Sequence, residues 1–157
     1  MEYLFTKHHD GSEANGTGKA LLMVNSEKEA VLLYGHGDDE LGGFRWQREY
    51  DHEPTESEVR ADIETLVNAL TEERIRTGLV VEGHHLWLSE ENQLNIQSAM
   101  APVRMKLGED EEGNPVYHTF ETEEELTAFR QMVSRHIMSC LNAGWEEKDN
   151  IQLTIKR

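Results

Sequence analysis

Two long helical patterns constrain the fold of this chain more than any other feature of its sequence. In the first, apolar residues recur at steps of three and four from Val59 to Ile75, which places them on one stripe of a helix. Pro54 and Thr55 precede acidic residues that suit the positive end of a helix dipole, and Gly78 follows the apolar stretch. The pattern predicts a helix of about six turns that begins after Pro54 and ends near Gly78.

The second long pattern begins with a capping box. Thr122 stands three residues before Glu125, so the hydroxyl and the carboxylate can each bind a backbone N–H group of the first turn. The apolar face of this helix consists of Leu126, Phe129, Met132, Val133, Ile137, Cys140 and Leu141. We expect the helix to end near residues 142–144, where a glycine stands, and Trp145 to fold back onto it.

Predicted strands account for most of the remaining sequence. Each is a short apolar run, or alternates apolar and polar residues, and is bounded by turn residues. They cover residues 20–24, 29–34, 43–50, 79–81, 86–88, 103–107, 115–120 and 151–155. Neighbouring runs pair as short hairpins, whereas residues 151–155 can add an edge strand to this sheet or to that of a neighbouring copy.

A shorter helix is predicted over residues 90–101, because Ser89 can cap its first turn and Pro102 stops it. The expected fold class is therefore α+β, with short β-hairpins packed against two long helices and one short helix. We expect two parts in the chain. Residues 1–53 would form a β-rich N-terminal arm or subdomain, and residues 54–157 an α+β domain.

The charge of the chain restricts its partners. Its 157 residues include 15 basic and 31 acidic side chains, which gives a formal net charge of −16. This charge repels nucleic-acid phosphates and anionic lipids, so we expect no direct nucleic-acid partner and no membrane partner, although a basic protein would be attracted. The single cysteine, Cys140, excludes an internal disulfide, and no apolar run approaches twenty residues. Both features predict a soluble chain in a reducing compartment.

Several patterns that carry chemistry in other proteins fail in this sequence. Residues 15–20 lack the hydroxyl of a phosphate-binding loop, and residues 108–113 lack the first ligand of a calcium loop. His84 and His85 are neighbours in a predicted hairpin, where their rings would point to opposite faces. We therefore expect no cofactor, no metal and no catalytic residue. The remaining cluster, which would suit a metal-dependent hydrolase, is His36, Asp38 and Asp39.

The candidate partner-binding residues are the three tryptophans, Trp46, Trp87 and Trp145. Tryptophan is enriched among the few residues that supply most of the binding energy of protein interfaces. The alternative for each is an anchor in the core or in a hairpin, since an indole ring buries a large apolar area. An exposed ring would favour contact with a partner.

Three stretches of the sequence carry a resemblance to known proteins. Residues 83–95 read GHHLWLSEENQLN, residues 117–120 read YHTF and residues 142–149 read NAGWEEKD. This succession resembles a family of short phage and prophage proteins that carry a domain of unknown function and are often encoded near tail-fibre and other late genes. The resemblance covers roughly residues 43–149. It implies a phage context and an accessory or structural role, and it brings no catalytic residues.

These observations favour a non-enzymatic phage or prophage accessory protein, associated with the tail, that acts through protein–protein contacts. Its partner would be a virion protein, a host protein or another copy of the chain, bound at the N-terminal hairpin region or at exposed strand edges. We expect it in the host cytoplasm, or in the virion if it is incorporated there. The alternative is a small acidic effector that binds a basic host protein, and the metal-dependent hydrolase ranks last.

Overall fold

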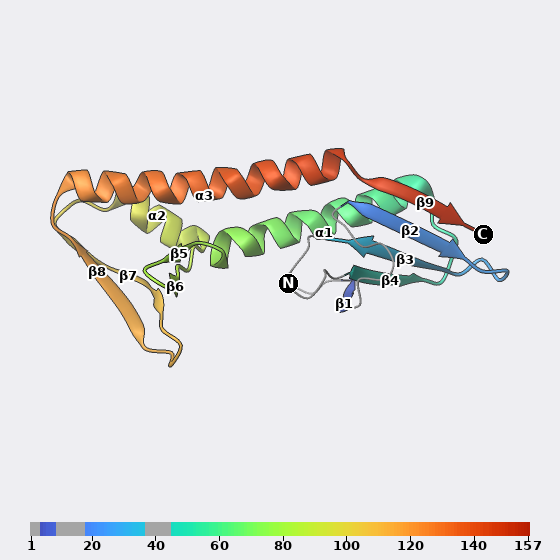
Figure 1. Ribbon diagram of the computed structural model, residues 1–157, viewed down its shortest axis with the longest axis horizontal. Coiled ribbons are helices and arrows are strands. Elements are labelled where there is room, and N and C mark those ends of the chain that lie inside the picture. The colour runs from blue at the N-terminus through green and yellow to red at the C-terminus, as the bar shows by residue number, and fades with distance from the viewer. Residues whose placement is uncertain (1–3, 9–17, 37–44) are drawn as a thin grey trace. The chain divides into compact units, whose positions relative to one another are not determined.

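The structure, a computed structural model, describes residues 4–8, 18–36 and 45–157 (Figure 1). Within these ranges the chain forms three helices and nine strands, which confirms the predicted α+β class with two long helices and one short helix. The helices are α1 (Glu56–Thr77), α2 (Glu90–Ser98) and α3 (Glu123–Asp149). None of these described helices is both long enough and apolar enough to cross a membrane.

The chain groups into two compact units. Unit 1 comprises Met1–Ala69 and Gly144–Arg157, and unit 2 comprises Leu70–Ala143. This grouping differs from the predicted division at residues 53 and 54, because it falls within α1 and within α3. The C-terminal strand is grouped with the N-terminal strands because it belongs to the same sheet.

Unit 1 is built on a five-stranded sheet with the order β1-β4-β3-β2-β9. Its strands are β1 (Thr6–His8), β2 (Lys19–Val24), β3 (Ala30–Gly35), β4 (Arg45–Tyr50) and β9 (Gln152–Lys156). The predicted hairpin of β2 and β3 is confirmed, and the C-terminal strand pairs parallel to β2 as an edge strand of this chain's own sheet. The α1 helix is tied to β4, because Asp62 Oδ2 accepts a hydrogen bond from Tyr50 Oη at 2.7 Å and lies 2.7 Å from Arg48 Nη1.

Unit 2 has an apolar core that is surrounded by α2, most of α3 and two small β ribbons. The ribbons are β5 (Val80–Val81) with β6 (His84–His85), and β7 (Val103–Glu109) with β8 (Pro115–Phe120). The buried core consists of Leu86, Leu88, Ile96, Phe120, Leu126, Phe129 and Val133. At the acidic turn, Asp110 Oδ1 accepts from the N–H groups of Glu112 and Asn114, both at 2.9 Å. This confirms that the acidic stretch is the turn of a hairpin.

Three predicted boundaries are wrong, each for a local reason. The α3 helix does not end at residues 142–144, because Gly144 is buried inside it, and Trp145 lies within the helix and does not fold back onto it. The α2 helix ends at Ser98, since Ala99 already has an extended conformation. In the ribbon of unit 2, β5 pairs with residues 84–85 and not with 86–88, because Glu82 and Gly83 both adopt positive φ and form a two-residue turn.

His52 lies between β4 and α1, and its pKa provides a test of the structure. His52 Nδ1 lies 2.8 Å from Asp51 Oδ1, and His52 Nε2 lies 2.8 Å from Glu58 Oε1. These hydrogen bonds, first to Asp51 and then to Glu58, raise the pKa of His52 above its ordinary value of about 6.5. The bond to His52 likewise lowers the pKa of Asp51.

We expect an NMR titration of His52 to give a pKa above about 6.5, and the Glu58→Gln substitution to bring it closer to that value. Because the folded pKa is raised, the stabilisation by His52 is present below the unfolded pKa and is lost as the pH rises through the folded one. A titration midpoint of His52 below its ordinary value would contradict this arrangement.

Candidate interaction groove

Residues 83–95 comprise the second half of the segment between α1 and α2 and the first turns of α2. His85 Nδ1 lies 2.7 Å from the carbonyl oxygen of Thr77, and the Leu88 N–H group donates to the carbonyl of Arg76 at 2.8 Å. His136 Nε2, from α3, lies 3.2 Å from the carbonyl oxygens of both Arg74 and Ile75. All four carbonyls of the last turn of α1 therefore have partners, and His85 acts as a helix cap.

The polar residues that follow Trp87 fix the backbone on both sides of it. Ser89 Oγ accepts from the Asn92 N–H group at 3.2 Å, which confirms the predicted cap of α2. Asn92 Nδ2 donates to the Trp87 carbonyl at 2.7 Å, and Gln93 Nε2 donates to the Leu88 carbonyl at 3.0 Å. The Trp87 N–H group donates to the Leu107 carbonyl at 3.2 Å. Both peptide groups of Trp87 are held in place.

Trp87 projects from this rigid segment into a groove. Its side chain is 47% exposed, and it borders a hollow of about 560 Å³. We call this hollow the Trp87 groove; it is lined by His85, Trp87, Ser89, Glu91, Asn92, Lys106, Gly108 and Glu109. A second hollow of about 390 Å³ shares Asn92 and Lys106 with it and lies between α2 and β7. A partner could therefore contact the indole and the α2–β7 surface together.

A glycine allows the two sides of the Trp87 groove to approach each other. A Cβ atom added to Gly108 would lie 2.6 Å from the carbonyl oxygen of His85, which is closer than such atoms come in proteins. Leu86 bridges to Gly108 at the same place, so β6 and β7 meet only because no side chain stands between them. No periodic pattern of the sequence predicts this contact.

The Trp87 groove carries charges of both signs. Lys106 Nζ lies 3.7 Å from Glu109 Oε1, and both side chains are more than half exposed, so this pair contributes little stability. Glu91 adds a second acid, and the guanidinium of Arg76 lies 5.8 Å from the centre of the Trp87 ring. A surface of this kind suits a protein partner with mixed polar and apolar groups better than a polyanion.

The other two candidate tryptophans lie in unit 1. Trp46, on β4, is 6% exposed, so it offers a partner almost no surface. Trp145, on α3, is about as exposed as Trp87, but it lines neither the Trp87 groove nor the hollow between α2 and β7. Trp87 combines an exposed ring with a groove, and this makes it the strongest of the three candidates.

Unit 1 contains a buried polar cluster that was not predicted from the sequence. Glu147 Oε2, on α3, accepts from Tyr34 Oη at 2.5 Å and lies 2.9 Å from His36 Nδ1. All three residues are buried. Burial, and then the hydrogen bond to Glu147, raise the pKa of Tyr34 far above its ordinary value, so the phenol stays protonated and serves as a donor. More than a hundred residues separate Tyr34 from Glu147 in the sequence, so no local spacing signals the cluster.

The described residues give little support to a metal site. Asp38 and Asp39, which the hydrolase hypothesis combined with His36, lie outside the residues that the structure describes. Among those that it does describe, no group of three or more histidine, cysteine or acidic side chains could hold a metal ion. The His36 side chain contacts Glu147 in the buried cluster instead.

Cys140 and His136 are close together without the properties of a catalytic pair. Cys140 Sγ lies 3.8 Å from His136 Nε2, but the thiol is buried and burial raises its pKa. A nucleophilic cysteine needs the opposite, an exposed position and a lowered pKa. The His136 ring is also committed to capping α1. This pair therefore has a packing role, as predicted for Cys140.

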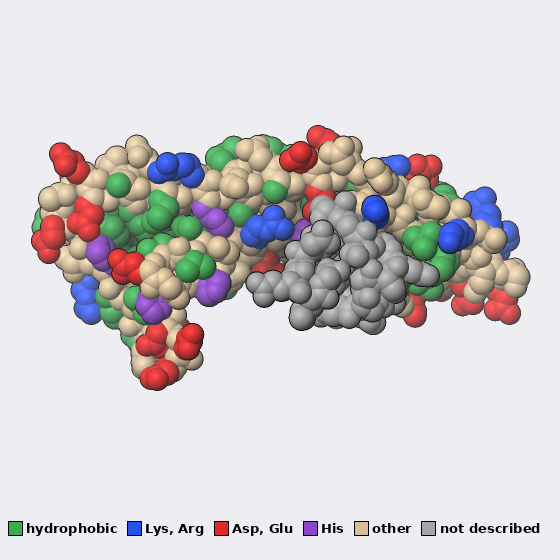
Figure 2. All heavy atoms as spheres, viewed as in Figure 1, with side chains coloured by type: hydrophobic (Ala, Val, Ile, Leu, Met, Phe, Trp, Pro, Cys, Tyr) green, Lys and Arg blue, Asp and Glu red, His purple; other side chains and the backbone are tan. Residues whose placement is uncertain are grey.

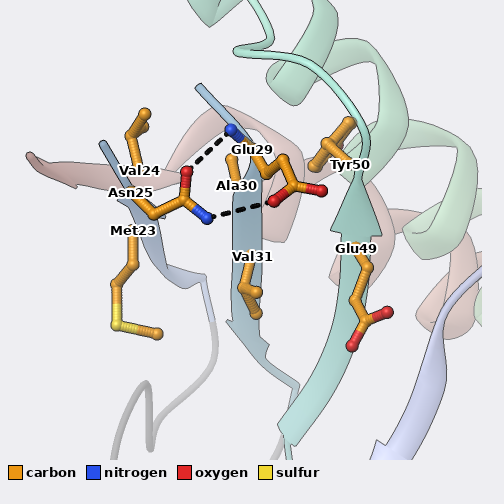
Figure 3. A pocket seen from close by; sticks show the side chains of 8 residues that line it. All are labelled: Met23, Val24, Asn25, Glu29, Ala30, Val31, Glu49 and Tyr50. Carbon is orange, nitrogen blue, oxygen red and sulfur yellow. Dashed lines mark hydrogen bonds between the residues drawn. The ribbon is translucent and has the colours of Figure 1, made fainter. Parts of the chain in front are cut away.

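Another hollow, of about 370 Å³, lies beside the β2–β3 turn in unit 1 (Figure 3). The side chains of Asn25 and Glu29 point toward each other, whereas that of Glu49 lies apart from them. Asn25 Oδ1 accepts from the Glu29 N–H group at 2.9 Å, and Asn25 Nδ2 donates to Glu29 Oε1 at 3.4 Å. These two hydrogen bonds hold the β2–β3 turn closed.

No protein-family model, curated protein or solved structure matches this chain. Its function is therefore inferred from its own residues and their geometry.

Proposed function

We propose that this chain is a non-enzymatic phage or prophage accessory protein, associated with the tail, that acts by binding other proteins. The phage context rests on the resemblance of residues 83–95, 117–120 and 142–149 to short phage and prophage proteins. The binding role rests on the Trp87 groove. The side chains that line the groove come from the first of these stretches and from β7.

The observation that carries the binding role is the exposed indole of Trp87 on a fixed backbone. Most of the energy of a protein interface comes from a few residues, often tryptophan, that fill pockets at its centre. Binding loses less conformational entropy when the contact residue is already held in place. The bonds from Asn92 to the Trp87 carbonyl and from Trp87 to Leu107 provide this order before a partner arrives.

Three described residues of types that often act in catalysis are buried in unit 1 or in the helix packing. Tyr34 and Glu147 bind each other in a buried cluster, and the Cys140 thiol is buried with a raised pKa. A nucleophile or base of an enzyme must reach its substrate. These placements support a binding role over a catalytic one.

Quantitative mass spectrometry of purified particles tests the tail association. We expect the chain to co-purify with particles at a copy number that matches a tail component, after induction of a host that carries the gene. A chain found only in the soluble lysate would remove the virion role and leave a host protein as the partner.

The Trp87 groove is tested by substitution in the same assay. We expect Trp87→Ala to reduce the bound amount at least about tenfold, as for a central interface residue worth more than about 1.4 kcal/mol. Met138→Ala is the matched control, because Met138 is also 47% exposed in unit 2 but does not line the groove. Equal binding by both variants would exclude the groove as the contact surface.

A second candidate is a small acidic effector that binds a basic host protein. The observation that favours it is the tip of the β7–β8 hairpin, where acidic side chains gather (Figure 2). In the sequence, Glu109, Asp110, Glu111 and Glu112 follow one another there. If this tip were the binding surface, the double substitution Glu111→Gln and Glu112→Gln would weaken binding, and salt would weaken it further. Binding that depends on Trp87 and is insensitive to these changes favours the first proposal.

A further inference from the structure

We propose that β9 pairs antiparallel with β9 of a second copy of this chain, which joins two five-stranded sheets into one. This contact goes beyond the proposed function, because it uses unit 1 and neither the Trp87 groove nor a tail partner. The backbone groups at the edge of the sheet are what would bind the second copy. The association can be measured on the purified chain alone.

Among the described strands, only β2 pairs with β9, on one of its two sides. The strand order ends at β9, and within the described ranges no other strand pairs with its far side (Figure 1). The Gln152 N–H group donates to the Gly18 carbonyl at 2.8 Å, so the backbone groups of Gln152 point toward β2. Because successive residues of a strand point their N–H and C=O groups to opposite sides, those of Leu153 and Ile155 point away from β2. These groups can bind another strand.

The side chains of β9 complement those of a second β9. With the two-fold axis at Thr154, Leu153 stands opposite Ile155 of the second copy, and each such pair exchanges both of its backbone hydrogen bonds. Leu153 lies beside Ala20 and Ile155 beside Leu22, two residues of the buried face of β2. Ile155 itself is 39% exposed. Pairing would therefore continue the buried apolar face across the junction and cover Ile155.

On the opposite face of the paired strands, no two side chains of like charge would lie directly opposite each other. Thr154 would meet Thr154 of the second copy, and Gln152 would meet Lys156. The arginine that follows, Arg157, is paired with Glu53 at 2.8 Å in its own chain. Local contacts thus favour association, whereas the net charge of −16 on each copy opposes it over longer distances.

The expected dimer is weak and strengthens with salt. A pair of five-residue strands buries less than the roughly 1,600 Å² of a standard interface, so we expect a dissociation constant on the order of 10 μM or weaker. Added salt screens the repulsion between two acidic chains while leaving the backbone hydrogen bonds in place. Sedimentation of the full chain should therefore show a monomer–dimer equilibrium that shifts toward dimer as ionic strength rises.

Charge substitutions at one position give opposite results if the register is correct. Gln152→Glu places a carboxylate opposite Lys156 of the second copy and should tighten the dimer about fivefold, because the two-fold axis creates the pair twice. Gln152→Lys places two cations together and should weaken it by a similar factor. Gln97→Glu and Gln97→Lys, on the exposed surface of α2, make the same changes of net charge away from β9 and serve as controls.

A chain that stays monomeric at every concentration and salt level would overturn the proposal. A dimer whose response to the Gln152 variants equals that to the Gln97 variants would overturn it as well. Hydrogen exchange distinguishes a second copy from another segment of the same chain as the partner of β9. If a second copy binds, amide protection of Leu153 and Ile155 should rise with protein concentration. Protection independent of concentration would assign the edge to another part of the same chain. Trp87→Ala should leave the dimer unchanged, so failure of the tail proposal and failure of this one are distinguishable.

Discussion

Glu147→Ala is expected to destabilise unit 1 by about 2–4 kcal/mol. The substitution removes the carboxylate that accepts from Tyr34 and contacts His36, and it leaves the Tyr34 phenol buried without that acceptor. It also removes the bond between the last turns of α3 and β3 of the sheet. A carboxylate at the negative end of a helix dipole is otherwise unfavourable, so its retention here depends on these donors. Chemical denaturation followed by circular dichroism measures the loss.

The neighbouring glutamate provides the control for this prediction. Glu146 is exposed on the same turn of α3, so Glu146→Ala should change the free energy of unfolding by less than about 0.5 kcal/mol. Glu147→Gln should fall between the two, because an amide oxygen still accepts a hydrogen bond but without the strength of a charged acceptor. Equal losses for the two alanine variants would show that the cluster does not stabilise the fold.

The helices could be predicted from the sequence because their signals are local. Thr122 Oγ1 accepts from the Glu125 N–H group at 3.2 Å, as the capping box predicts. Thr55 Oγ1 caps α1 in the same way, since it accepts from the Glu58 N–H group at 3.1 Å. The predicted end of α3 at residues 142–144 is wrong because a glycine ends a helix only where the backbone leaves the helical conformation. Buried Gly144 lies inside the helix instead.

The sheet order and the buried cluster could not be predicted, because both depend on residues far apart in the chain. The pairing of β9 with β2 brings Leu153 beside Ala20, and the cluster brings Glu147 to Tyr34 and His36. No spacing rule connects such positions. Only part of the Trp87 groove could be predicted from the sequence, namely the cap at Ser89. The capping of α1 by His85 and the close approach at Gly108 depend on the tertiary structure.

Leu88→Ala is expected to destabilise unit 2 by about 2–5 kcal/mol, the range for loss of a buried leucine. Leu88 is fully buried in the core that includes Phe120 and Leu126. Its N–H group also binds the carbonyl of Arg76 at the end of α1. A smaller side chain leaves a cavity where this core lies under the backbone next to Trp87. The free energy of unfolding measured in urea should therefore fall.

The same substitution at an exposed leucine is the control. It shows how much stability is lost by a Leu→Ala change outside the core. Leu94, on α2, is 68% exposed, so Leu94→Ala should change the stability by less than about 0.5 kcal/mol. Since Leu88 and Trp87 are adjacent, Leu88→Ala should also loosen the groove, which would appear as faster hydrogen exchange of the Trp87 amide. If Leu94→Ala costs as much as Leu88→Ala, the core that supports the groove is not formed as described.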